Sequence, residues 1–230
     1  MSEPSGVHVY YTRITEVPVV RYLDWLSVEE RARYRRFYFD ADREVFLMAH
    51  ALVRSVLGEW AGLAPSALRF QTAVNGKPAV AAGTSGEEIH FNLSHTRELV
   101  ACAVSRACPL GVDVEGIDVE RDVSGVARRV LSETEHSDWN SRTGEARARR
   151  FFEYWTLKEA YIKALGVGLD QPLRDLTFTI LPGGRATVST AEHGHPWLLR
   201  TYEPVNGVLL SVALRPEASE VPLRIEERTP

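Results

Sequence analysis

Two acidic residues stand close together in a short segment whose pattern suits metal chemistry. Asp113 and Glu115 are two residues apart in the strand-like Gly111-Val-Asp-Val-Glu115, so their side chains project from the same face of a strand. Neighbouring carboxylates raise each other's pKa unless a cation or a basic side chain lies between them. Mg2+ is such a cation, because it binds one or two carboxylates and completes its octahedron with water and substrate phosphate. For this pair alone, a solvated strand edge is the simpler explanation, since Asp-x-Glu is common.

The helix-forming segment from Tyr154 to Lys163 adds a third carboxylate. Trp155, Glu159 and Lys163 follow one another at steps of four residues, which places them along one helix face. On an exposed helix, Glu159 and Lys163 would form an ordinary ion pair that contributes only a few tenths of a kcal/mol. The surrounding residues are largely apolar, however, so we expect the charged groups to face a cleft. A carboxylate and an ammonium would suit a metal-bound phosphate there.

A third group of polar residues lies at a turn and at the end of a strand. Gly76 and Pro78 fix a turn that presents Lys77. Ser94 and His95 stand where a strand-like segment gives way to a loop, which is a common place for functional groups. Each of these residues alone is better explained as an ordinary turn or surface residue. Their significance comes from their occurrence together with the acidic pair and the helix.

The hydrophobic pattern predicts the elements that position these residues. Apolar residues recur at helical spacing from Val45 to Leu57, which predicts a helix over roughly 41–59, and residues 151–165 predict a second helix that ends before Gly166. The strands between residues 89 and 115 are expected to be antiparallel and joined by short turns. Strands are predicted at 7–11, 89–93, 99–105, 110–115, 177–181, 185–189, 197–202 and 208–214.

The two halves of the chain resemble each other in outline. Each has a helix ending in Leu-Gly, at Leu57-Gly58 and Leu165-Gly166, then a Leu and a Pro, and then a strand with Leu-x-Phe, at Leu68-Arg-Phe70 and Leu176-Thr-Phe178. This pattern favours an α/β (α+β) fold of two related halves, each a helix packed on a small antiparallel sheet, with a ligand cleft between them. The expected division is residues 1–108, residues 109–215 and a peripheral tail at 216–230.

The composition is that of an ordinary globular protein. Of the 230 residues, 44% are hydrophobic and 25% are charged, which argues against disordered and fibrous architectures, and the formal charge of −4 gives no general attraction to nucleic acid or membranes. Cys102 and Cys108 are too few for a disulfide framework and are expected to be reduced thiols. No window approaches the ~18 apolar residues of a membrane span, and the first residues lack a signal-peptide pattern. A cytoplasmic location is therefore expected.

The sequence resembles the Sfp-type 4′-phosphopantetheinyl transferases in the order and spacing of four motifs, which cover roughly residues 33–172. These motifs are Arg35-Arg-Phe37…Asp42-Arg43 running into Ala49-His-Ala-Leu-Val-Arg54; Asn75-Gly-Lys-Pro78; Phe91-Asn-Leu-Ser-His95 continuing to Gly111-Val-Asp-Val-Glu115; and Trp155-Thr-Leu-Lys-Glu-Ala-Tyr-Ile-Lys163. The resemblance implies a pseudo-twofold duplication with the active site in the cleft between the halves. It also implies Mg2+-dependent transfer of the 4′-phosphopantetheine arm of coenzyme A to a serine of an apo acyl or peptidyl carrier protein, with release of 3′,5′-ADP and with Mn2+ as an alternative ion.

The resemblance further implies roles for individual residues. The first half, residues 1–108, is expected to hold the nucleotide end of coenzyme A, and the second half is expected to hold the metal and the pyrophosphate. Asp113, Glu115 and Glu159 match the metal ligands, and Asp113, Glu159 and Lys163 are implied as catalytic. The implied contacts with coenzyme A are Lys77, Ser94, His95, Lys158, Lys163 and Arg43, with Arg33 and Arg36 as alternatives to Arg43 at the 3′-phosphate; Glu135 stands outside this set.

Two other functions remain open at this stage. A metal-dependent nuclease also uses clustered carboxylates with a lysine, but this chain is net acidic, and Lys158 directly precedes Glu159 instead of following it. A non-catalytic module that binds coenzyme A or a carrier protein is the second alternative. The general base, either Glu159 or a metal-bound water, stays open, as do the pathway (fatty-acid, polyketide or nonribosomal-peptide) and the use of acyl-coenzyme A. We expect a monomer.

Overall fold

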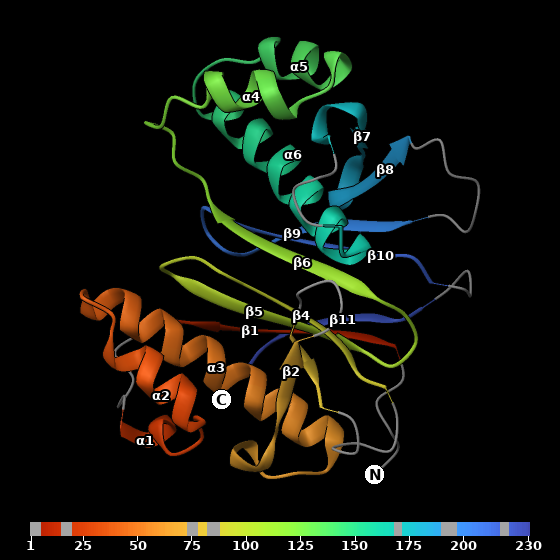
Figure 1. The fold of residues 1–230 in the computed structure, drawn as a ribbon. Coiled ribbons are helices and arrows are strands. Elements are labelled where there is room, and N and C mark those ends of the chain that lie inside the picture. Colours follow the sequence, from red (N-terminus) through yellow and green to blue (C-terminus); the bar gives the residue numbers. More distant parts are fainter. Residues whose placement is uncertain are drawn as a thin grey trace. The chain divides into compact units, whose positions relative to one another are not determined.

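The computed structural model describes residues 6–14, 20–72, 78–81, 88–167, 172–189, 197–216 and 221–230. The chain divides into two compact units, one formed by residues 1–107 with 221–230 and the other by residues 108–220 (Figure 1). In the described part of the chain, no helix is long and apolar enough to cross a membrane.

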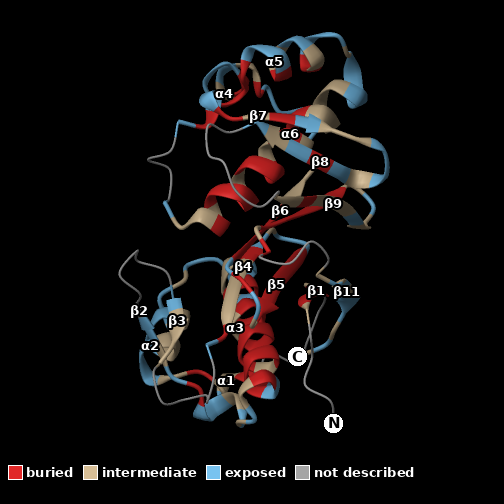
Figure 2. Cartoon of the chain, turned by 90° about the vertical axis from the view of Figure 1, so that its right-hand side faces the viewer, coloured by how far each residue is buried: buried red, intermediate tan, exposed pale blue. Residues whose placement is uncertain are grey.

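The first unit is built on a four-stranded sheet in the order β11-β1-β5-β4. The long helix α3 (Asp40–Ala61) packs on this sheet, and Figure 2 shows buried residues concentrated along α3 and β5. The strands β1, β5 and β4 are antiparallel neighbours, whereas β11 lies parallel to β1 at the edge. The other bounds are β1 (Val7–Arg13), α1 (Val20–Leu23), α2 (Val28–Arg35), η1 (Pro65–Ala67), β2 (Phe70–Thr72), β3 (Pro78–Val80), β4 (His90–His95), β5 (Leu99–Ser105) and β11 (Leu223–Glu227).

The second unit contains a five-stranded antiparallel sheet in the order β6-β10-β9-β8-β7. The long helix α6 (Gly144–Leu165) packs on β6 and β10, and apolar residues of α4 and α5 complete the core. The bounds are β6 (Leu110–Gly116), α4 (Ser124–Val130), α5 (Glu133–Asn140), η3 (Leu173–Asp175), β7 (Thr177–Ile180), η4 (Pro182–Gly184), β8 (Arg185–Ser189), β9 (Leu198–Val205) and β10 (Val208–Leu214).

Each unit contains the same arrangement at the end of its long helix. Both helices end at a glycine in the left-handed conformation, Gly62 with φ of 68° and Gly166 with φ of 77°. Eight residues before each glycine, a cationic side chain is buried: Arg54 in α3 and Lys158 in α6. Gly62 is therefore the structural equivalent of Gly166. The Leu-Gly pattern in the sequence instead pairs Gly58 with Gly166, so the predicted alignment of the two helices is wrong by four residues.

Arg54 joins three segments of the first unit. Its guanidinium is 2% exposed, donates to the backbone carbonyls of Pro65 (2.9 Å) and Leu68 (3.2 Å), and lies 2.8 Å from the Glu30 carboxylate. Glu30 also accepts a hydrogen bond from the backbone N–H of Ser27 (2.7 Å), which completes the capping box of α2. Arg54 is thus a structural residue, although it belongs to the first sequence motif.

Lys158 joins the equivalent segments of the second unit. Its fully buried ammonium donates to the carbonyls of Leu173 (2.7 Å) and Leu176 (2.6 Å) and lies 2.9 Å from the Glu135 carboxylate. Glu135 completes the capping box of α5 by accepting from the backbone N–H of Ser132 (2.8 Å). The predicted contact of Lys158 with coenzyme A is therefore wrong, because its three ammonium protons all have acceptors inside the core.

The duplicated α+β fold predicted from the sequence is confirmed, and two connections differ from expectation. The strands β4 and β5 pair as predicted, but β6 pairs with β10 instead of with its sequence neighbour. The tail contains a strand that the sequence pattern does not predict, because β11 has no run of apolar residues and is held at the edge by its backbone pairing with β1.

Candidate active site

The acidic residues and the lysine lie on β6 and α6, which approach each other closely at Gly111. A Cβ at this position would lie 2.0 Å from the carbonyl oxygen of Ala160 and 2.5 Å from the backbone nitrogen of Ala164. Only glycine fits there without moving the helix. Because alternate residues of a strand share a face, Asp113 and Glu115 lie on the same side of β6 as Gly111 and therefore face α6.

A buried chain of hydroxyls also fixes α6 on the sheet. The Thr156 hydroxyl lies 2.8 Å from that of Ser211 in β10, which in turn lies 2.9 Å from the Thr201 hydroxyl in β9. Ser211 is the direct cross-strand partner of Asp113. Since Thr156 is almost one helical turn before Glu159, this chain sets the position of Glu159 along the sheet.

Lys163 reaches from the last turn of α6 to β6. Its ammonium donates to a carboxylate oxygen of Asp113 (2.7 Å) and to the carbonyl of Val112 (3.2 Å). Asp113 is 5% exposed, whereas the Lys163 side chain keeps 28% of its surface accessible. The pair thus combines a buried carboxylate with an ammonium that can still reach a ligand.

Glu115 has a different partner. The indole N–H of Trp155 donates to its carboxylate at 2.9 Å, which orients Glu115 against α6. The pattern of steps of four along α6 therefore has a physical meaning: Trp155 and Lys163 each contact one acidic residue of β6.

Burial and mutual repulsion raise the pKa of two of the three carboxyl groups. Burial raises the pKa of Glu159 to about 7, with repulsion from Asp113 and, more weakly, from Glu115, against the attraction of Lys163. The pKa of Glu115 is also raised, chiefly by burial, although the hydrogen bond from Trp155 opposes the shift. Ionisation of Glu159 and Glu115 is therefore disfavoured in the absence of a cation, chiefly because both carboxyl groups are partly buried.

Three neighbouring carboxyl groups are a suitable donor set for a hard divalent cation such as Mg2+. Among the residues that the structure describes, no group of three or more His, Cys, Asp and Glu side chains is arranged so that it could hold a metal ion. Lys163 and Trp155 contact oxygens of two of these carboxylates. The three carboxyl groups are thus of the type that Mg2+ binds, but their side chains are not arranged as metal ligands in this structure.

The first unit contains a cavity of about 440 Å3 with a mixed lining. Arg33, His95 and Arg97 contribute polar groups, and Phe37 and Phe46 are among the apolar lining residues. The Arg33 guanidinium lies 5.4 Å from the centroid of the Phe46 ring. Asp42 adds a carboxylate, but the basic groups outnumber it, and together with the aromatic rings they suit a ligand that is both anionic and aromatic, such as a nucleotide.

The other predicted residues of this unit lie in different places. Ser94 is buried in β4, next to His95. Arg43 forms an ion pair with Asp40 and donates to the Phe37 carbonyl (2.8 Å), and it is not among the described residues that line the cavity. Of the three alternative arginines, Arg33 is therefore the one at the cavity, and Arg36 is absent from the same lining.

The predicted contact of Lys77 lies outside the described residues. Arg97 is a cavity residue that the sequence motifs do not single out, although it stands two residues after His95. Gly111 and Ser211 are further residues missed as parts of the site. The glycine could have been found from its position two residues before Asp113 on the same strand face, but nothing local marks Ser211.

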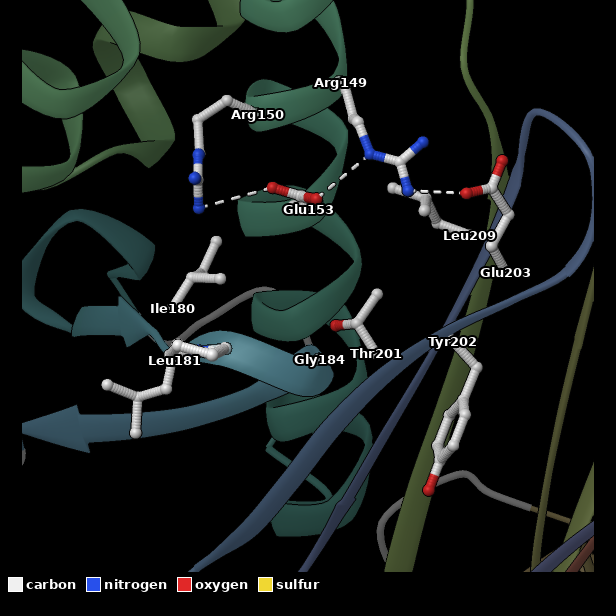
Figure 3. Close-up of a pocket in the computed structure, with 11 residues that line it drawn as sticks. Arg149, Arg150, Glu153, Ile180, Leu181, Gly184, Thr201, Tyr202, Glu203 and Leu209 are labelled. Atoms are coloured by element: carbon white, nitrogen blue, oxygen red, sulfur yellow. Dashed lines mark hydrogen bonds and ion pairs between the residues drawn. The ribbon is translucent and has the colours of Figure 1, made fainter.

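The second unit has its own cavity of about 490 Å3, shown in Figure 3. Its charged lining residues are paired with each other: Arg149 lies 2.6 Å from Glu203, and Arg150 lies 3.3 Å from Glu153. None of the described residues of the predicted site lines it. Its size alone therefore does not make it the reaction site.

Both units match models of one family of enzymes. Residues 109–213 match the model described as 4'-phosphopantetheinyl transferase superfamily, and residues 15–107 match that described as 4'-phosphopantetheinyl transferase, N-terminal. A holo-(acyl-carrier-protein) synthase from Bacillus anthracis, solved in complex with CoA (3',5'-ADP), is 18% identical with a TM-score of 0.43, covering 49% of this chain and 98% of that chain.

Several relatives are similar over most of their length. The chain is 33% identical over 189 residues to the 4'-phosphopantetheinyl transferase HetI of Nostoc sp., covering 82% of this chain and 78% of that protein. It is 32% identical over 204 residues to the 4'-phosphopantetheinyl transferase Sfp of Bacillus subtilis, covering 87% of each. The match to psf-1 of Bacillus pumilus is 34% over 197 residues, covering 85% and 82%. The chain therefore belongs to the 4'-phosphopantetheinyl transferase superfamily, as an enzyme of the Sfp type.

Proposed function

We propose that this enzyme uses Mg2+ at the carboxylates of its second unit to transfer the 4′-phosphopantetheine arm of coenzyme A to a carrier-protein serine, with release of 3′,5′-ADP. Transfer of the arm from coenzyme A to carrier proteins is the activity of the family. The observation that carries the rest is the contact of Lys163 with Asp113 beside Glu159, whose pKa is raised to about 7. Such a cluster suits a cation together with a phosphate.

Asp113, Glu115 and Glu159 would hold the metal ion, with Mn2+ as an alternative to Mg2+. When bound there, the ion would supply positive charge and Lewis acidity to the pyrophosphate oxygens. The support for this assignment is the mutual proximity of the three carboxyl groups, two of which have a raised pKa in the absence of a cation.

Two side chains of the enzyme would act on the reaction directly. The serine oxygen attacks the β-phosphorus of coenzyme A, the bond from that phosphorus to the oxygen of 3′,5′-ADP breaks, and the serine proton passes to a base. Lys163 would balance the charge that develops on the leaving phosphate. Glu159 is one proposed base for the serine proton, and its pKa of about 7 applies to the protein without the cation. A water molecule remains the alternative base.

The first unit would bind the nucleotide end of coenzyme A. Its cavity combines Arg33, His95 and Arg97 with aromatic side chains, which suits a phosphorylated nucleoside. Lys77 and Ser94 are proposed contacts to the same end of the ligand. The first unit would then bind the nucleotide end of coenzyme A, and the second unit would bind the reacting pyrophosphate.

We also propose a monomer in the cytoplasm. Two related units in one chain could build a complete site without a second subunit. Cys102 and Cys108 are both buried thiols, and burial raises the pKa of Cys102 to about 12, which makes Cys102 unreactive. Such thiols suit a reducing compartment.

One experiment tests the proposed activity. The purified enzyme is incubated with Mg2+, coenzyme A and a panel of apo carrier proteins from fatty-acid, polyketide and nonribosomal-peptide synthesis, and mass spectrometry measures addition of the arm. The reaction should require Mg2+ and stop with a chelator. A parallel reaction with acyl-coenzyme A tests the range of donors. Carrier binding in calorimetry without any modified carrier would instead support a non-catalytic binding module.

A further inference from the structure

The first unit contains positions equivalent to those of the reaction site in the second unit. Counted back from the capping glycine of each long helix, Ser55 of α3 takes the position of Glu159 in α6, and Glu59 takes the position of Lys163. The same count pairs the two buried cations described above. The equivalence therefore rests on tertiary contacts as well as on spacing.

The first strands of the two units are equivalent in the same way. β1 and β6 are both seven residues long, and each pairs antiparallel with the strand beneath its long helix. The fourth residue is Tyr10 in β1 and Asp113 in β6. Tyr10 packs in the core with residues of α3, so it faces its helix as Asp113 does. The positions of Asp113, Glu159 and Lys163 are thus taken by Tyr10, Ser55 and Glu59.

Arg228 fills this equivalent site. It follows β11 directly, and its backbone N–H donates to the carbonyl of Tyr11 in β1 (2.8 Å). Its guanidinium lies 2.7 Å from the Glu59 carboxylate, 3.4 Å from the Ser55 hydroxyl and 5.1 Å from the centroid of the Tyr10 ring. Tyr10 is 4% exposed, whereas the side chains of Arg228 and Glu59 are 24% and 49% exposed, so the ring contact is shielded from water and the ion pair remains largely open to it.

We propose that Tyr10, Ser55 and Glu59 form a guanidinium-binding site in the first unit and that its ligand is Arg228 of the same chain. A carboxylate, a hydroxyl acceptor and the face of an aromatic ring together match a flat, delocalised cation with several N–H donors. A single guanidinium nitrogen, Nη2, makes both the contact with Glu59 and the contact with Ser55, so the preference over an ammonium rests on the contact of the flat group with the Tyr10 ring. The site goes beyond the proposed transferase activity and does not depend on it.

The site gives the last segment of the chain a specific anchor. β10 belongs to the second unit and β11 to the first, so the chain returns to the first unit after residue 220. β11 is an edge strand of five residues with three exposed side chains, which gives it little apolar surface to bury. Arg228 adds a directed contact at the point where this edge strand ends.

The test is chemical rescue of a variant that lacks the ligand. Arg228→Ala should lower the midpoint of thermal unfolding by about 2–4 °C, as expected for one partly exposed ion pair in a protein of this size. Ethylguanidinium at about 0.1–0.3 M should then recover part of this loss by binding the emptied site, because a contact between partly exposed groups gives only weak affinity for a free ligand. Ethylammonium at the same concentration is the control for charge, and Arg224→Ala, which removes an exposed arginine of the same strand, is the matched variant.

The outcomes separate a specific site from a general effect. Rescue should occur in Arg228→Ala but not in the wild type, in Arg224→Ala or in the double variant Arg228→Ala/Glu59→Gln. Equal stabilisation by ethylammonium, or equal stabilisation of all variants, would overturn the proposal. If Arg228→Ala does not fold, folding in the presence of ethylguanidinium supports the site and continued failure counts against it. Transfer of the phosphopantetheine arm by the folded variant reports separately on the proposed function.

Discussion

Burial and repulsion act together on the carboxyl group of Glu159. Its pKa of about 7 means that about half of the folded, metal-free molecules carry a proton on this carboxyl at pH 7. Both causes of the shift would be relieved by a bound cation. Asp113 differs, because its carboxylate already has an ammonium at 2.7 Å.

The stability of the metal-free protein should therefore depend on pH through Glu159. An acid whose folded-state pKa is raised above its ordinary value of 4.5 is protonated more readily in the folded state. The free energy of unfolding should consequently fall as the pH rises from about 4.5 through about 7. Denaturant unfolding in a chelator should show this fall in the wild type, and Glu159→Gln should flatten it.

Glu159→Gln should also lower transfer turnover by about a few hundredfold while remaining folded. A folded variant with near wild-type turnover would contradict the assigned role.

Lys163 occupies an Asp113 oxygen that a metal ion would also need. Lys163→Met should therefore tighten the binding of Mn2+ to the enzyme in the absence of coenzyme A by about tenfold, because the competing charge is removed. The same variant should lower transfer turnover, since the ammonium is lost from the pyrophosphate. Paramagnetic resonance of free Mn2+ measures the binding. Unchanged or weaker Mn2+ affinity in a folded Lys163→Met enzyme would contradict this competition.

Arg33, near the end of α2, and Arg43, near the start of α3, should differ in how much they contribute to the binding of coenzyme A. Arg33 lines the first-unit cavity, whereas Arg43 is engaged with Asp40 and with a backbone carbonyl. Arg33→Ala should raise the KM for coenzyme A about tenfold with little change in turnover, because its contact is to the non-reacting end. Arg43→Ala should change it less. Steady-state kinetics with varied coenzyme A measures the KM of both variants. A larger rise in KM for Arg43→Ala than for Arg33→Ala would instead place Arg43 at the ligand.

At the scale of elements, the distance between α6 and β6 decides whether the acidic residues and the lysine can meet. Gly111 sets that distance, and the hydroxyl chain through Ser211 sets the position of the helix along the strand. Neither feature touches the reacting atoms. Both act by holding Glu159 and Lys163 over Asp113.

Gly111→Ala should therefore destabilise the protein by about 3 kcal/mol or more, because its methyl group would meet backbone atoms that cannot move independently. Gly125→Ala is the matched control, since nothing lies within 4 Å of a Cβ there. That control should be neutral or slightly stabilising. Urea unfolding followed by circular dichroism measures both variants. Equal stability of the two would show that α6 can shift at little cost.

For the whole molecule, the repeated buried cation organises each unit. Arg54 and Lys158 tie a long helix to the chain that follows it and to the capping box of a preceding helix. Two carbonyls and one carboxylate satisfy each cation, which offsets the cost of burying its charge. This duplicated construction explains why both residues fall within motifs without taking part in the chemistry.

Lys158→Met should accordingly lower the free energy of unfolding by about 3–5 kcal/mol, since it leaves the Glu135 carboxylate buried without its cation. Its KM for coenzyme A should stay close to the wild-type value. Denaturant unfolding and steady-state kinetics on the same preparation distinguish the two roles. A raised KM with unchanged stability would restore Lys158 as a ligand contact.

Local patterns in the sequence predicted most elements of this protein and the residues proposed to take part in its chemistry. The helical spacing of apolar residues in 41–59 and 151–165 and the alternation in 110–115 depend on neighbouring residues alone, and so does the shared face of Asp113 and Glu115. The order of the motifs was enough to identify the family, because each motif is a short contiguous segment.

Only the tertiary structure decided which of these residues serve the fold. Lys158 and Glu159 are adjacent in sequence but point about 100° apart on the helix, so one enters the core and the other faces β6. The pairing of β6 with β10 and the docking of Arg228 against Tyr10 join residues far apart in the chain. No local pattern specifies such contacts, because they depend on which surfaces the folded units bring together.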